Sequence, residues 1–338
     1  MFNILLILKF RLKMRAIIPV AGFGTRLKPH TYSWPKVLLN VGGKPILGHI
    51  LDKLLEEKIR KATFIIGHLG DKIKTYIAKE YPSISADFIE QKDMLGLGHA
   101  IYTAIPTFDE DEIFIILGDT VFEVELKDVF ANKSTALGTK VVEDPRRFGV
   151  AICENGIIKK LVEKPTELVS NLALVGLYYI TNPNLLANCL TELIEKNIRT
   201  KNEFQLTDAL QLMIDAGERI TTFPVEGWYD CGKPETLLST NKFLLTRNGN
   251  NSTKDGNVIN PPVFIADSAI VKNSVIGPYT TIAENCKIEN SIISNSIISP
   301  KAEISETLLD NSLIGSNSIV KGKSKRLNTG DSSEIELY

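Results

Sequence analysis

Short apolar runs alternate with amphipathic stretches over the first two thirds of the chain. Four runs, at residues 16–20, 62–66, 86–89 and 113–117, have the length and composition of buried strands. Six aliphatic residues from Ile46 to Leu55 follow the i, i+3/i+4 spacing of a helix with one apolar face, and residues 71–81 predict a second helix. This alternation predicts βαβ units in a mainly parallel sheet that helices cover on both faces. Because ligands of such sheets bind beyond the carboxyl ends of the strands, we expect a site in the segments that follow them.

A different rhythm begins after residues 248–260, a polar stretch without apolar periodicity that predicts a linker. Aliphatic residues then recur at eleven positions with gaps of five or six: Ile265, Val271, Ile276, Ile282, Ile288, Ile293, Ile298, Ile304, Leu309, Ile314 and Val320. No helix or ordinary strand has this period, whereas hexapeptide β-helix repeats turn one aliphatic side chain inward on each flat face. With three faces per coil, the pattern predicts a β-helix of about three to four turns.

Composition and charge narrow the classes of partner. The formal net charge is −1, so no overall field attracts nucleic acid or an anionic membrane, and any phosphate binding must come from a local site. The four cysteines, Cys153, Cys189, Cys231 and Cys286, lie far apart and have no metal-like spacing. We therefore expect reduced thiols in a cytoplasmic protein.

Residues 1–13 have a pattern of their own. An apolar run is followed by Lys9, Arg11 and Lys13, which fits neither a membrane-spanning helix nor a signal peptide. Met14 then leads directly into the first predicted strand. We therefore expect Met14 to be the initiator and residues 1–13 to be an extension outside the fold; N-terminal sequencing of the native protein that finds Phe2 would contradict this.

A glycine-rich segment, Gly22-Phe23-Gly24-Thr25-Arg26, directly follows the first strand. Its glycines allow a tight turn that brings backbone N–H groups close to phosphate oxygens, and Arg26 adds a planar, permanently charged fork. The segment has neither the third glycine of the dinucleotide fingerprint nor a Walker sequence. Alone it is also compatible with an ordinary glycine turn.

The continuation of this segment carries a longer pattern. Residues 22–45 match G-x-G-T-R-L-x-P-x-T-x-x-x-P-K-x-L-L-x-V-x-x-K-P, with Lys36 and Lys44 as its two lysines. This pattern resembles the signature of the sugar-phosphate nucleotidyltransferases, and the resemblance extends over nearly the whole chain from Met14. Within that family the chain is most similar to the glucose-1-phosphate thymidylyltransferases and uridylyltransferases.

The resemblance implies a fold and a division of the chain. The fold is of the α/β class: a Rossmann-like three-layer αβα domain with a mainly parallel mixed sheet, followed by a short left-handed parallel β-helix. We expect the catalytic domain at residues 14–250, a linker at 251–260, and the β-helix and a tail at 261–338. Residues 323–331 are a candidate cap for the open end of the β-helix.

The resemblance also implies which residues bind nucleotide and carry the chemistry. The nucleotide-binding set is Gly22, Gly24, Thr25, Arg26, Gln91 and Gly96. The catalytic set is Arg26, Lys36, Asp119 and Asp230, of which Asp119 and Asp230 would hold Mg²⁺. A glutamine amide such as Gln91 can pair with the O4/N3–H edge of a pyrimidine because it offers both a donor and an acceptor. Mg²⁺ suits a pair of carboxylates supplemented by phosphate oxygens. We expect His99 to pack or cap.

On the sugar side, the resemblance implies that Gly149, Glu163, Lys164 and Val175 bind the sugar phosphate. Glu163 would accept hydrogen bonds from sugar hydroxyls, Lys164 would hold the phosphate, and Gly149 and Val175 would contact the sugar through their backbones. Residues 202–208 resemble a segment that supports this pocket. Phe148 stands where many thymidylyltransferases carry tyrosine, which leaves the choice of sugar open.

The predicted reaction transfers a nucleotidyl group from dTTP or UTP to a sugar 1-phosphate, with glucose 1-phosphate the first candidate, and releases pyrophosphate. Such an enzyme would serve nucleotide-sugar and polysaccharide biosynthesis, and the β-helix favours a homo-oligomer. Three alternatives are a guanylyl- or adenylyltransferase of the same fold acting on a sugar such as mannose 1-phosphate, a non-catalytic regulatory subunit that binds nucleotide sugars, and a bifunctional enzyme with an acetyltransferase on its β-helix. The last lacks a histidine base, since no histidine follows His99.

Overall fold

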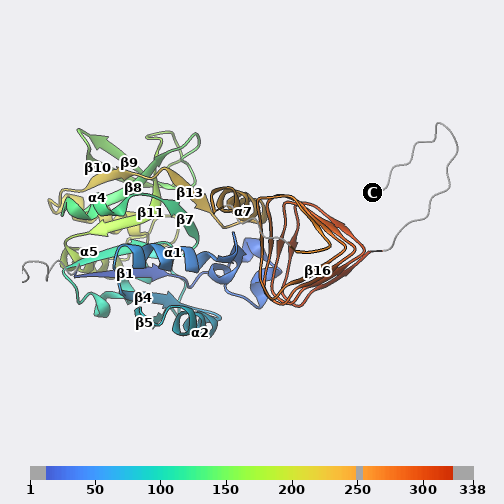
Figure 1. Ribbon diagram of the computed structural model, residues 1–338. Helices are drawn as coiled ribbons and strands as arrows, with labels where there is room; N and C mark the ends of the chain where they lie inside the picture. The colour runs from blue at the N-terminus through green and yellow to red at the C-terminus, as the bar shows by residue number, and fades with distance from the viewer. Residues whose placement is uncertain (1–12, 249–253, 323–338) are drawn as a thin grey trace, which may run out of the picture. The chain divides into compact units, whose positions relative to one another are not determined.

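The chain divides into two compact units (Figure 1). The computed structural model describes residues 13–248 and 254–322. Unit 1 comprises the chain up to Leu39 together with Lys44–Thr236, and unit 2 comprises Asn40–Gly43 together with the chain from Leu237 onward. In the described part of the chain, no helix is both long and apolar enough to cross a membrane.

Unit 1 is built on a nine-stranded mixed sheet with the order β5-β4-β1-β6-β11-β8-β12-β10-β9. Its strands are β1 (Met14–Pro19), β4 (Lys61–Ile66), β5 (Ser85–Glu90), β6 (Glu112–Ile116), β8 (Ala136–Val141), β9 (Gly149–Glu154), β10 (Ile157–Glu163), β11 (Leu172–Ile180) and β12 (Thr221–Pro224). Strands β5, β4, β1 and β6 run parallel, and β11 runs antiparallel to both β6 and β8. Strands β7 (Thr120–Glu123) and β13 (Gly227–Asp230) form a separate antiparallel ribbon.

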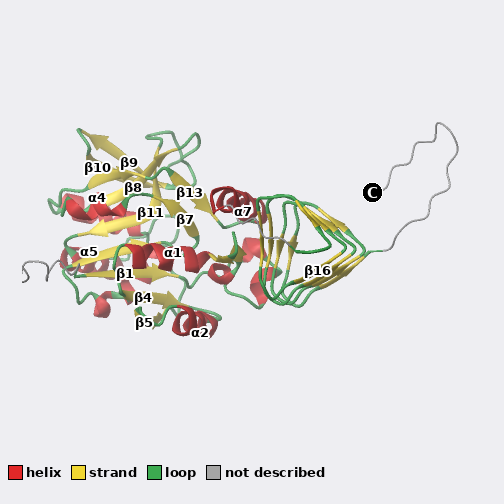
Figure 2. Ribbon diagram, viewed as in Figure 1, coloured by secondary structure: helices red, strands yellow, loops and turns green. Residues whose placement is uncertain are grey.

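Helices connect these strands (Figure 2). They are α1 (Ile46–Glu56), α2 (Gly70–Glu80), α3 (Leu97–Thr103), α4 (Leu126–Ala131), α5 (Pro183–Glu195) and α6 (Leu206–Asp215). Shorter elements are the 3₁₀ turns η1 (Thr25–Leu27), η2 (His30–Tyr32), η3 (Lys36–Leu38) and η4 (Ile105–Thr107), and the two-residue strands β2 (Asn40–Val41) and β3 (Lys44–Pro45).

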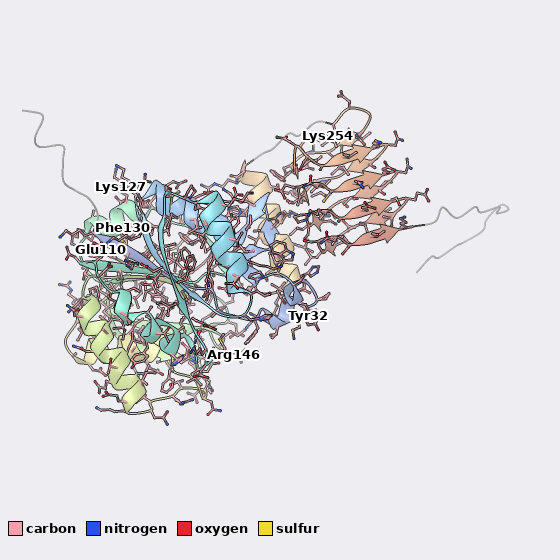
Figure 3. The ribbon with its side chains drawn as sticks, turned by 90° about the horizontal axis from the view of Figure 1, so that it is seen from below. Tyr32, Glu110, Lys127, Phe130, Arg146 and Lys254 are labelled. Carbon is pink, nitrogen blue, oxygen red and sulfur yellow. The ribbon has the colours of Figure 1, made fainter. Side chains whose placement is uncertain are left out.

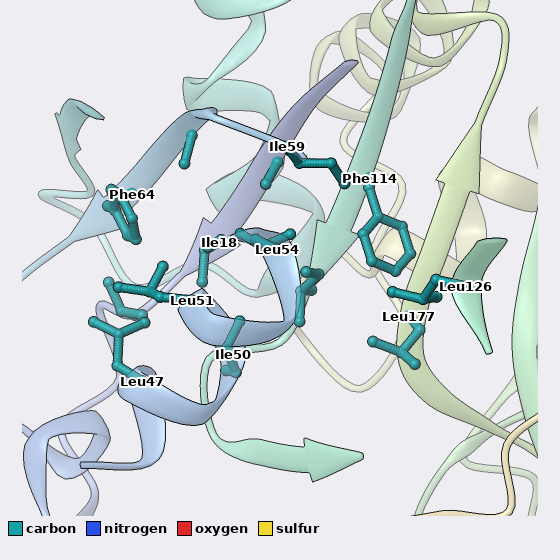
Figure 4. Packing of buried hydrophobic residues seen from close by; sticks show 14 of the residues in the cluster. Ile18, Leu47, Ile50, Leu51, Leu54, Ile59, Phe64, Phe114, Leu126 and Leu177 are labelled. Carbon is teal, nitrogen blue, oxygen red and sulfur yellow. The ribbon is translucent and has the colours of Figure 1, made fainter. Parts of the chain in front are cut away.

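The sheet separates two apolar cores, as the two-residue period of its strands requires. On one face, Ile18 and Phe64 pack with Leu51 and other aliphatic residues of α1, as Figure 4 shows. On the other face, Ile17 and Ile65 pack with residues of α3, α5 and α6. The neighbours Ile17 and Ile18 are therefore both fully buried, which confirms the predicted helix layer on each side of the sheet. The predicted α/β fold is confirmed.

Unit 2 contains α7 (Pro234–Asn248) from Leu237 onward and three parallel four-stranded sheets. Their strands are β14 (Val258–Ile259), β15 (Val263–Ile265), β16 (Ile270–Lys272), β17 (Val275–Ile276), β18 (Thr280–Ile282), β19 (Lys287–Glu289), β20 (Ile292–Ile293), β21 (Ile297–Ile298), β22 (Glu303–Ser305), β23 (Leu308–Leu309), β24 (Leu313–Ile314) and β25 (Ile319–Lys321). Figure 2 shows these strands stacked coil upon coil. The predicted β-helix is confirmed.

The predicted aliphatic positions form three stacks along this β-helix. The register aligns Ile265, Ile282, Ile298 and Ile314 in one sheet and Val271, Ile288, Ile304 and Val320 in the second. The third contains Ile276, Ile293 and Leu309. Several corners between the faces have asparagine at positive φ, which asparagine tolerates better than most residues; examples are Asn273, Asn290 and Asn311.

The predicted linker and the predicted ends of the chain differ in how far the structure describes them. Val258–Ile259, within the predicted linker 251–260, forms strand β14 and pairs with β17, so the β-helix begins before residue 261, its predicted start. Residues 1–12, 249–253 and 323–338 lie outside the described residues, and these include most of the predicted extension and the whole candidate cap.

A buried asparagine organises the first coil of unit 2. The side chain of Asn241, on α7, is fully buried. Its Oδ1 accepts hydrogen bonds from the backbone N–H of Gly42 (2.8 Å) and the hydroxyl of Thr281 (2.7 Å), and its Nδ2 donates to the carbonyl of Tyr279 (2.9 Å). A methyl group added at Gly43 would lie 2.6 Å from the ring of Phe264. The four-residue segment Asn40–Gly43 is therefore packed into unit 2.

Candidate functional site

Several of the predicted site residues follow the carboxyl ends of strands of unit 1. Gly22 and Gly24 follow β1, Gln91 follows β5, and Asp119 lies between β6 and β7. The loop after β4 lies beside the loop after β1, because a methyl group added at Gly67 would lie 2.9 Å from the carbonyl oxygen of Ala21. In Figure 3, Tyr32 and Arg146, which follow β1 and β8, lie away from Glu110, which precedes β6. The site residues thus share one edge of the sheet.

The glycine loop is folded against the segment that carries Lys36. Gly24 has a positive φ of 60°, and a methyl group there would lie 2.9 Å from Thr31 Cγ2 and 3.0 Å from Lys36 Cβ. The Thr31 hydroxyl donates to the carbonyl of Gly24 (2.9 Å). Only glycine combines this backbone conformation with so close an approach. Gly22, in contrast, has open space where a side chain would project.

Lys36 and Asp119 form a direct ion pair. The Nζ of Lys36 lies 2.6 Å from Oδ2 of Asp119; the lysine side chain is 9% exposed and the aspartate 40%. The other oxygen of Asp119 has a 3.4 Å contact with the hydroxyl of Thr120. Two residues far apart in the sequence thus meet where the glycine loop ends.

The β7–β13 ribbon places Asp230 and Arg26 in the same cluster. Asp230 is the register partner of Thr120, and the N–H of Cys231 donates to the carbonyl of Asp119 (3.1 Å). A methyl group added at Gly232 would lie 2.7 Å from both Arg26 Nη2 and Asp230 Oδ1. Arg26 and Asp230 therefore lie beside Gly232, and the chain next to Asp230 is bonded to Asp119, the partner of Lys36.

This donor set fits the implied Mg²⁺. No group of three or more histidine, cysteine or acidic side chains with metal-binding geometry occurs in residues 13–248 and 254–322. Asp119 and Asp230 are hard oxygen donors on adjacent strand ends, and Mg²⁺ is typically held by one or two carboxylates while phosphate oxygens and water complete its shell.

Gln91 forms a second cluster with the start of α3. It is buried, and its Nε2 lies 3.4 Å from both the carbonyl of Gly96 and Nδ1 of His99. Burial lowers the pKa of His99 because it disfavours the charged ring. The ring of His99 also faces those of Tyr102 and Phe204, with centroids 6.5 Å apart in each pair. These contacts agree with the expected packing role of His99.

The segment before α6, which contains Phe204, is hydrogen-bonded to this cluster. The N–H of Phe204 donates to the carbonyl of Leu95 (2.8 Å), and the N–H of Gly98 donates to the carbonyl of Phe204 (2.7 Å). A methyl group added at Gly96 would lie 2.6 Å from that same carbonyl oxygen. The close approach of two backbones therefore requires glycine at position 96.

Glu163 centres a third cluster. It ends β10 opposite Gly149 of β9, and its side chain is 8% exposed. Its Oε2 accepts a hydrogen bond from the hydroxyl of Thr207 (2.7 Å), and its Oε1 lies 3.2 Å from Nζ of Lys164. A methyl group added at Gly149 would lie 2.9 Å from both Glu163 Oε2 and Thr207 Oγ1. Burial and the nearby Glu163 carboxylate raise the pKa of Asp208, the next residue of α6.

An aromatic contact connects the Glu163 cluster with strand β13, which carries Asp230. Phe148, beside Gly149, packs edge to face on Trp228 of β13, with ring centroids 4.8 Å apart. Val175 lies on β11, where the pairing with β8 is interrupted between Leu174 and Tyr178. Its side chain is buried in the core, so its contact with a sugar through the backbone stays a prediction.

Two residues of this arrangement escape prediction from the sequence. Thr207 lies in the segment predicted to support the pocket, but nothing in its neighbours indicates a bond to Glu163. Gly232 directly follows the Asp230–Cys231 pair, and its need for a small side chain appears only when Arg26 is brought beside it. The other predicted site residues that lie in the three clusters are Gly24, Arg26, Lys36, Gln91, Gly96, Asp119, Gly149, Glu163, Lys164 and Asp230. Gly22 and Thr25 adjoin Gly24 in the chain, and Val175 lies in the core.

Comparison with known proteins gives consistent matches. A family described as nucleotidyl transferase matches residues 15–247. The bifunctional protein GlmU of Methanocaldococcus jannaschii is 35% identical over 82% of this chain and 71% of its own length. The UTP–glucose-1-phosphate uridylyltransferase AglF of Haloferax volcanii is 33% identical over 66% of this chain and 93% of its own. A solved structure of a UDP-glucose pyrophosphorylase complexed with UDP-glucose superposes with a TM-score of 0.60 at 25% identity, covering 69% of this chain and 99% of that one.

Proposed function

Because the chain belongs to the nucleotidyl transferase family and is a sugar-phosphate nucleotidyltransferase, we propose that it transfers a uridylyl or thymidylyl group from UTP or dTTP to glucose 1-phosphate. The products would be the nucleoside diphosphate sugar and pyrophosphate. The observation that supports a catalytic role best is the cluster of Arg26, Lys36, Asp119 and Asp230, in which Lys36 pairs with Asp119 and Arg26 lies with Asp230 beside Gly232.

The chemistry is an in-line displacement at phosphorus. An oxygen of the sugar 1-phosphate forms a bond to the α-phosphorus, and the bond between that phosphorus and its bridging oxygen to the β-phosphate breaks, so pyrophosphate carries away the electron pair. The nucleophile is already an anion, so no general base is required. Positioning and charge neutralisation supply the rate enhancement, and Arg26 and Lys36 would provide the positive charge.

Asp119 and Asp230 are the residues that would hold Mg²⁺. When bound, the ion would neutralise charge on the phosphate oxygens. Lys36 is well suited to act beside it, because its ammonium group already lies against the Asp119 carboxylate and is shielded from water.

The way Gln91 is held supports the proposed base preference. Its Nε2 faces the Gly96 carbonyl and His99, so its Oε1 is left to accept a hydrogen bond from substrate. Uracil and thymine carry an N3–H that donates to such an oxygen, and cytosine carries none. Uracil and thymine differ by one methyl group, worth about 1 kcal/mol, so both nucleotides are candidate substrates.

The sugar phosphate would be bound by the Glu163 cluster. Glu163 would accept hydrogen bonds from sugar hydroxyls, and Lys164, whose side chain is 41% exposed, would hold the phosphate. Gly149 and Val175 would contact the sugar through their backbones. We further propose that the enzyme works in the cytoplasm, in nucleotide-sugar supply for polysaccharide synthesis, as a homo-oligomer.

The test is pyrophosphate release by the purified protein with Mg²⁺ and glucose 1-phosphate, across dTTP, UTP, CTP, GTP and ATP. We expect release with UTP or dTTP that EDTA abolishes. Arg26→Ala and Asp119→Asn should each lower kcat by about a thousandfold or more while the circular dichroism spectrum stays unchanged. Asp128→Asn, at an exposed position of α4, is the matched control and should retain full activity.

Other outcomes would redirect the assignment. Release with GTP and mannose 1-phosphate would indicate a guanylyltransferase. If no pyrophosphate is released with any of the five nucleotides or with other sugar 1-phosphates, a non-catalytic nucleotide-sugar-binding subunit would be favoured. Near-wild-type rates in either Arg26→Ala or Asp119→Asn would contradict the assigned roles.

A further inference from the structure

One flat face of the β-helix presents a row of aliphatic side chains to solvent. This face is formed by strands β14, β17, β20 and β23, whose register aligns one outward residue per coil. Three of these residues are between 50% and 70% exposed, and the fourth is half-buried. We call the row the aliphatic ladder; it consists of Val258, Val275, Ile292 and Leu308. At about 4.8 Å per coil, the ladder is roughly 14 Å long.

The other two faces of the β-helix differ from this one. On the charged face, formed by β16, β19, β22 and β25, side chains of opposite charge pair along the stack, as Lys287 does with Glu303 at 2.8 Å. The face formed by β15, β18, β21 and β24 is bonded to α7 within unit 2, where the hydroxyl of Thr281 donates to Asn241 (2.7 Å). A row of exposed aliphatic residues on the remaining face therefore indicates an interaction surface.

The charge beside the ladder is concentrated at its Leu308 end. In the first three coils the corners that flank the ladder are asparagine, serine and glycine, at positions 256–257, 260, 273–274, 277, 290–291 and 294. In the last coil they include Glu306 and Asp310, both exposed. The hydroxyl of Ser294 (2.6 Å) and the side-chain amide of Asn295 (2.8 Å) donate to Asp310 and hold its pKa low, so this end stays negative.

Side-chain size and charge both fit a second copy of the same ladder turned end for end. In such a two-fold pair, Leu308 of one copy faces Val258 of the other and Ile292 faces Val275, so every contact joins a valine to a larger side chain. The acidic end of each copy then lies beside the uncharged corners of the other copy's first coil. A pair in the same direction would instead place Leu308 on Leu308, with four carboxylates around them.

We propose that the aliphatic ladder is the centre of a homodimer interface in which two β-helices lie side by side in opposite directions. The asparagine- and serine-rich corners form its polar rim. Docking of the ladder on the charged face would instead remove water from pairs such as Lys287 and Glu303. The inference specifies the homo-oligomer included in the proposed function, but it rests on neither the reaction nor its substrates.

The test is sedimentation velocity of the full chain over a range of concentrations. We expect wild type to form a dimer and Ile292→Glu to raise its Kd by at least about a hundredfold, because the two-fold axis places the added carboxylate in the interface twice. Ile292→Thr, which keeps the branched shape, should raise the Kd by about tenfold. Ile270→Glu is the matched control: it makes the same change at a 48% exposed isoleucine of the charged face and should leave the dimer unchanged.

A pair of charge substitutions tests the direction of the two β-helices. Val258→Lys and Leu308→Glu should each weaken the dimer by about a hundredfold, because each places a charge against an aliphatic side chain of the other copy. The double variant, with both changes in one chain, should return to within about tenfold of wild type, because each added ammonium group then meets an added carboxylate. In a pair with the same direction, the double variant would bring like charges together and be no better than either single variant.

Several results would overturn the proposal. They are a monomeric or trimeric wild type, a dimer that survives Ile292→Glu, an equal loss with Ile270→Glu, and a double variant without recovery. Circular dichroism at concentrations where wild type is monomeric should give the same unfolding midpoint for wild type and Ile292→Glu. A lower midpoint for the variant would mean that another part of the same chain covers the ladder, and would also overturn the proposal.

These measurements separate the interface from the assigned reaction, because they need no substrate. A dimer that is lost in Ile292→Glu but releases no pyrophosphate would contradict the reaction and support the interface. Pyrophosphate release by a monomeric wild type would support the reaction and overturn the interface.

Discussion

Gly96→Ala is the substitution whose effect the structure defines most sharply. Gly96 has φ 111° and ψ 175°, a region of backbone conformation that only glycine populates freely. The added methyl group would also lie 2.6 Å from the carbonyl oxygen of Phe204, which is itself bonded to Gly98 N–H. We expect about 1–3 kcal/mol of backbone strain and a further ~1–3 kcal/mol from overpacking, a loss of about 2–6 kcal/mol in the free energy of unfolding.

A second glycine isolates the conformational part of this cost. Gly156, in the turn between β9 and β10, has φ 75° and open space where a side chain would project. Gly156→Ala should therefore cost only the ~1–2 kcal/mol of a left-handed residue. The difference between the two variants measures the contact with Phe204 together with the extra strain of the Gly96 conformation over a left-handed one.

Urea unfolding followed by tryptophan fluorescence is the appropriate assay, since the chain's two tryptophans, Trp34 and Trp228, both lie in unit 1. Gly96→Ala should also raise KM for the nucleotide, because the displaced segment holds Gln91 and His99 in place. Equal stability losses in Gly96→Ala and Gly156→Ala would refute the reasoning, since the Phe204 backbone would then be free to move aside.

Two further predictions concern parts of the chain remote from the site. Arg15 donates to both oxygens of Asp109 (2.8 and 2.9 Å) and holds the pKa of that carboxyl low. Arg15→Met should lower the free energy of unfolding by about 2 kcal/mol at pH 7. This difference between wild type and variant should disappear as the pH falls below about 4, because the Asp109 carboxylate is then protonated. The urea midpoint of the wild type should therefore fall more steeply with pH than that of the variant. In the β-helix, Ile288→Ala should cost about 2–5 kcal/mol, whereas Leu308→Ala, 70% exposed, should cost under about 0.5, both measured by circular dichroism during denaturation; similar losses in these two would contradict the inward stacking.

Local patterns in the sequence predict the elements of the fold and much of the site. Strands β1, β4, β5 and β6 and helices α1 and α2 lie within two residues of their expected positions, because each is defined by its own apolar spacing. The β-helix is predicted equally well, since one aliphatic residue per face is enough to define a coil. The glycine loop and Asp119 follow from their places after strands.

What the sequence does not predict depends on pairs that are distant along the chain. The hydroxyl of Thr207 and the carboxylate of Glu163 are separated by 44 residues, and Lys36 and Asp119 by 83. Gly96 has a recognisable place in a motif, but the backbone that demands glycine there comes from residues 203–204. Ile259 lies six residues before Ile265 and in register with Ile276, but it stands in a polar stretch, so strand β14 and its pairing with β17 appear only in three dimensions.

The position of Asn40–Gly43 has a consequence for how the two units could be separated or exchanged. This segment interrupts the sequence of unit 1 only three residues after Lys36, yet its hydrogen bond to Asn241 and its packing on Phe264 belong to unit 2. Unit 2 is therefore discontinuous in the sequence, and a chain cut after Thr236 would retain the Gly42–Gly43 turn without the partners that fix it. A hybrid protein that contains the β-helix of a relative would therefore also need that relative's counterpart of Asn40–Gly43. The two segments lie almost two hundred residues apart in the sequence but must be exchanged together.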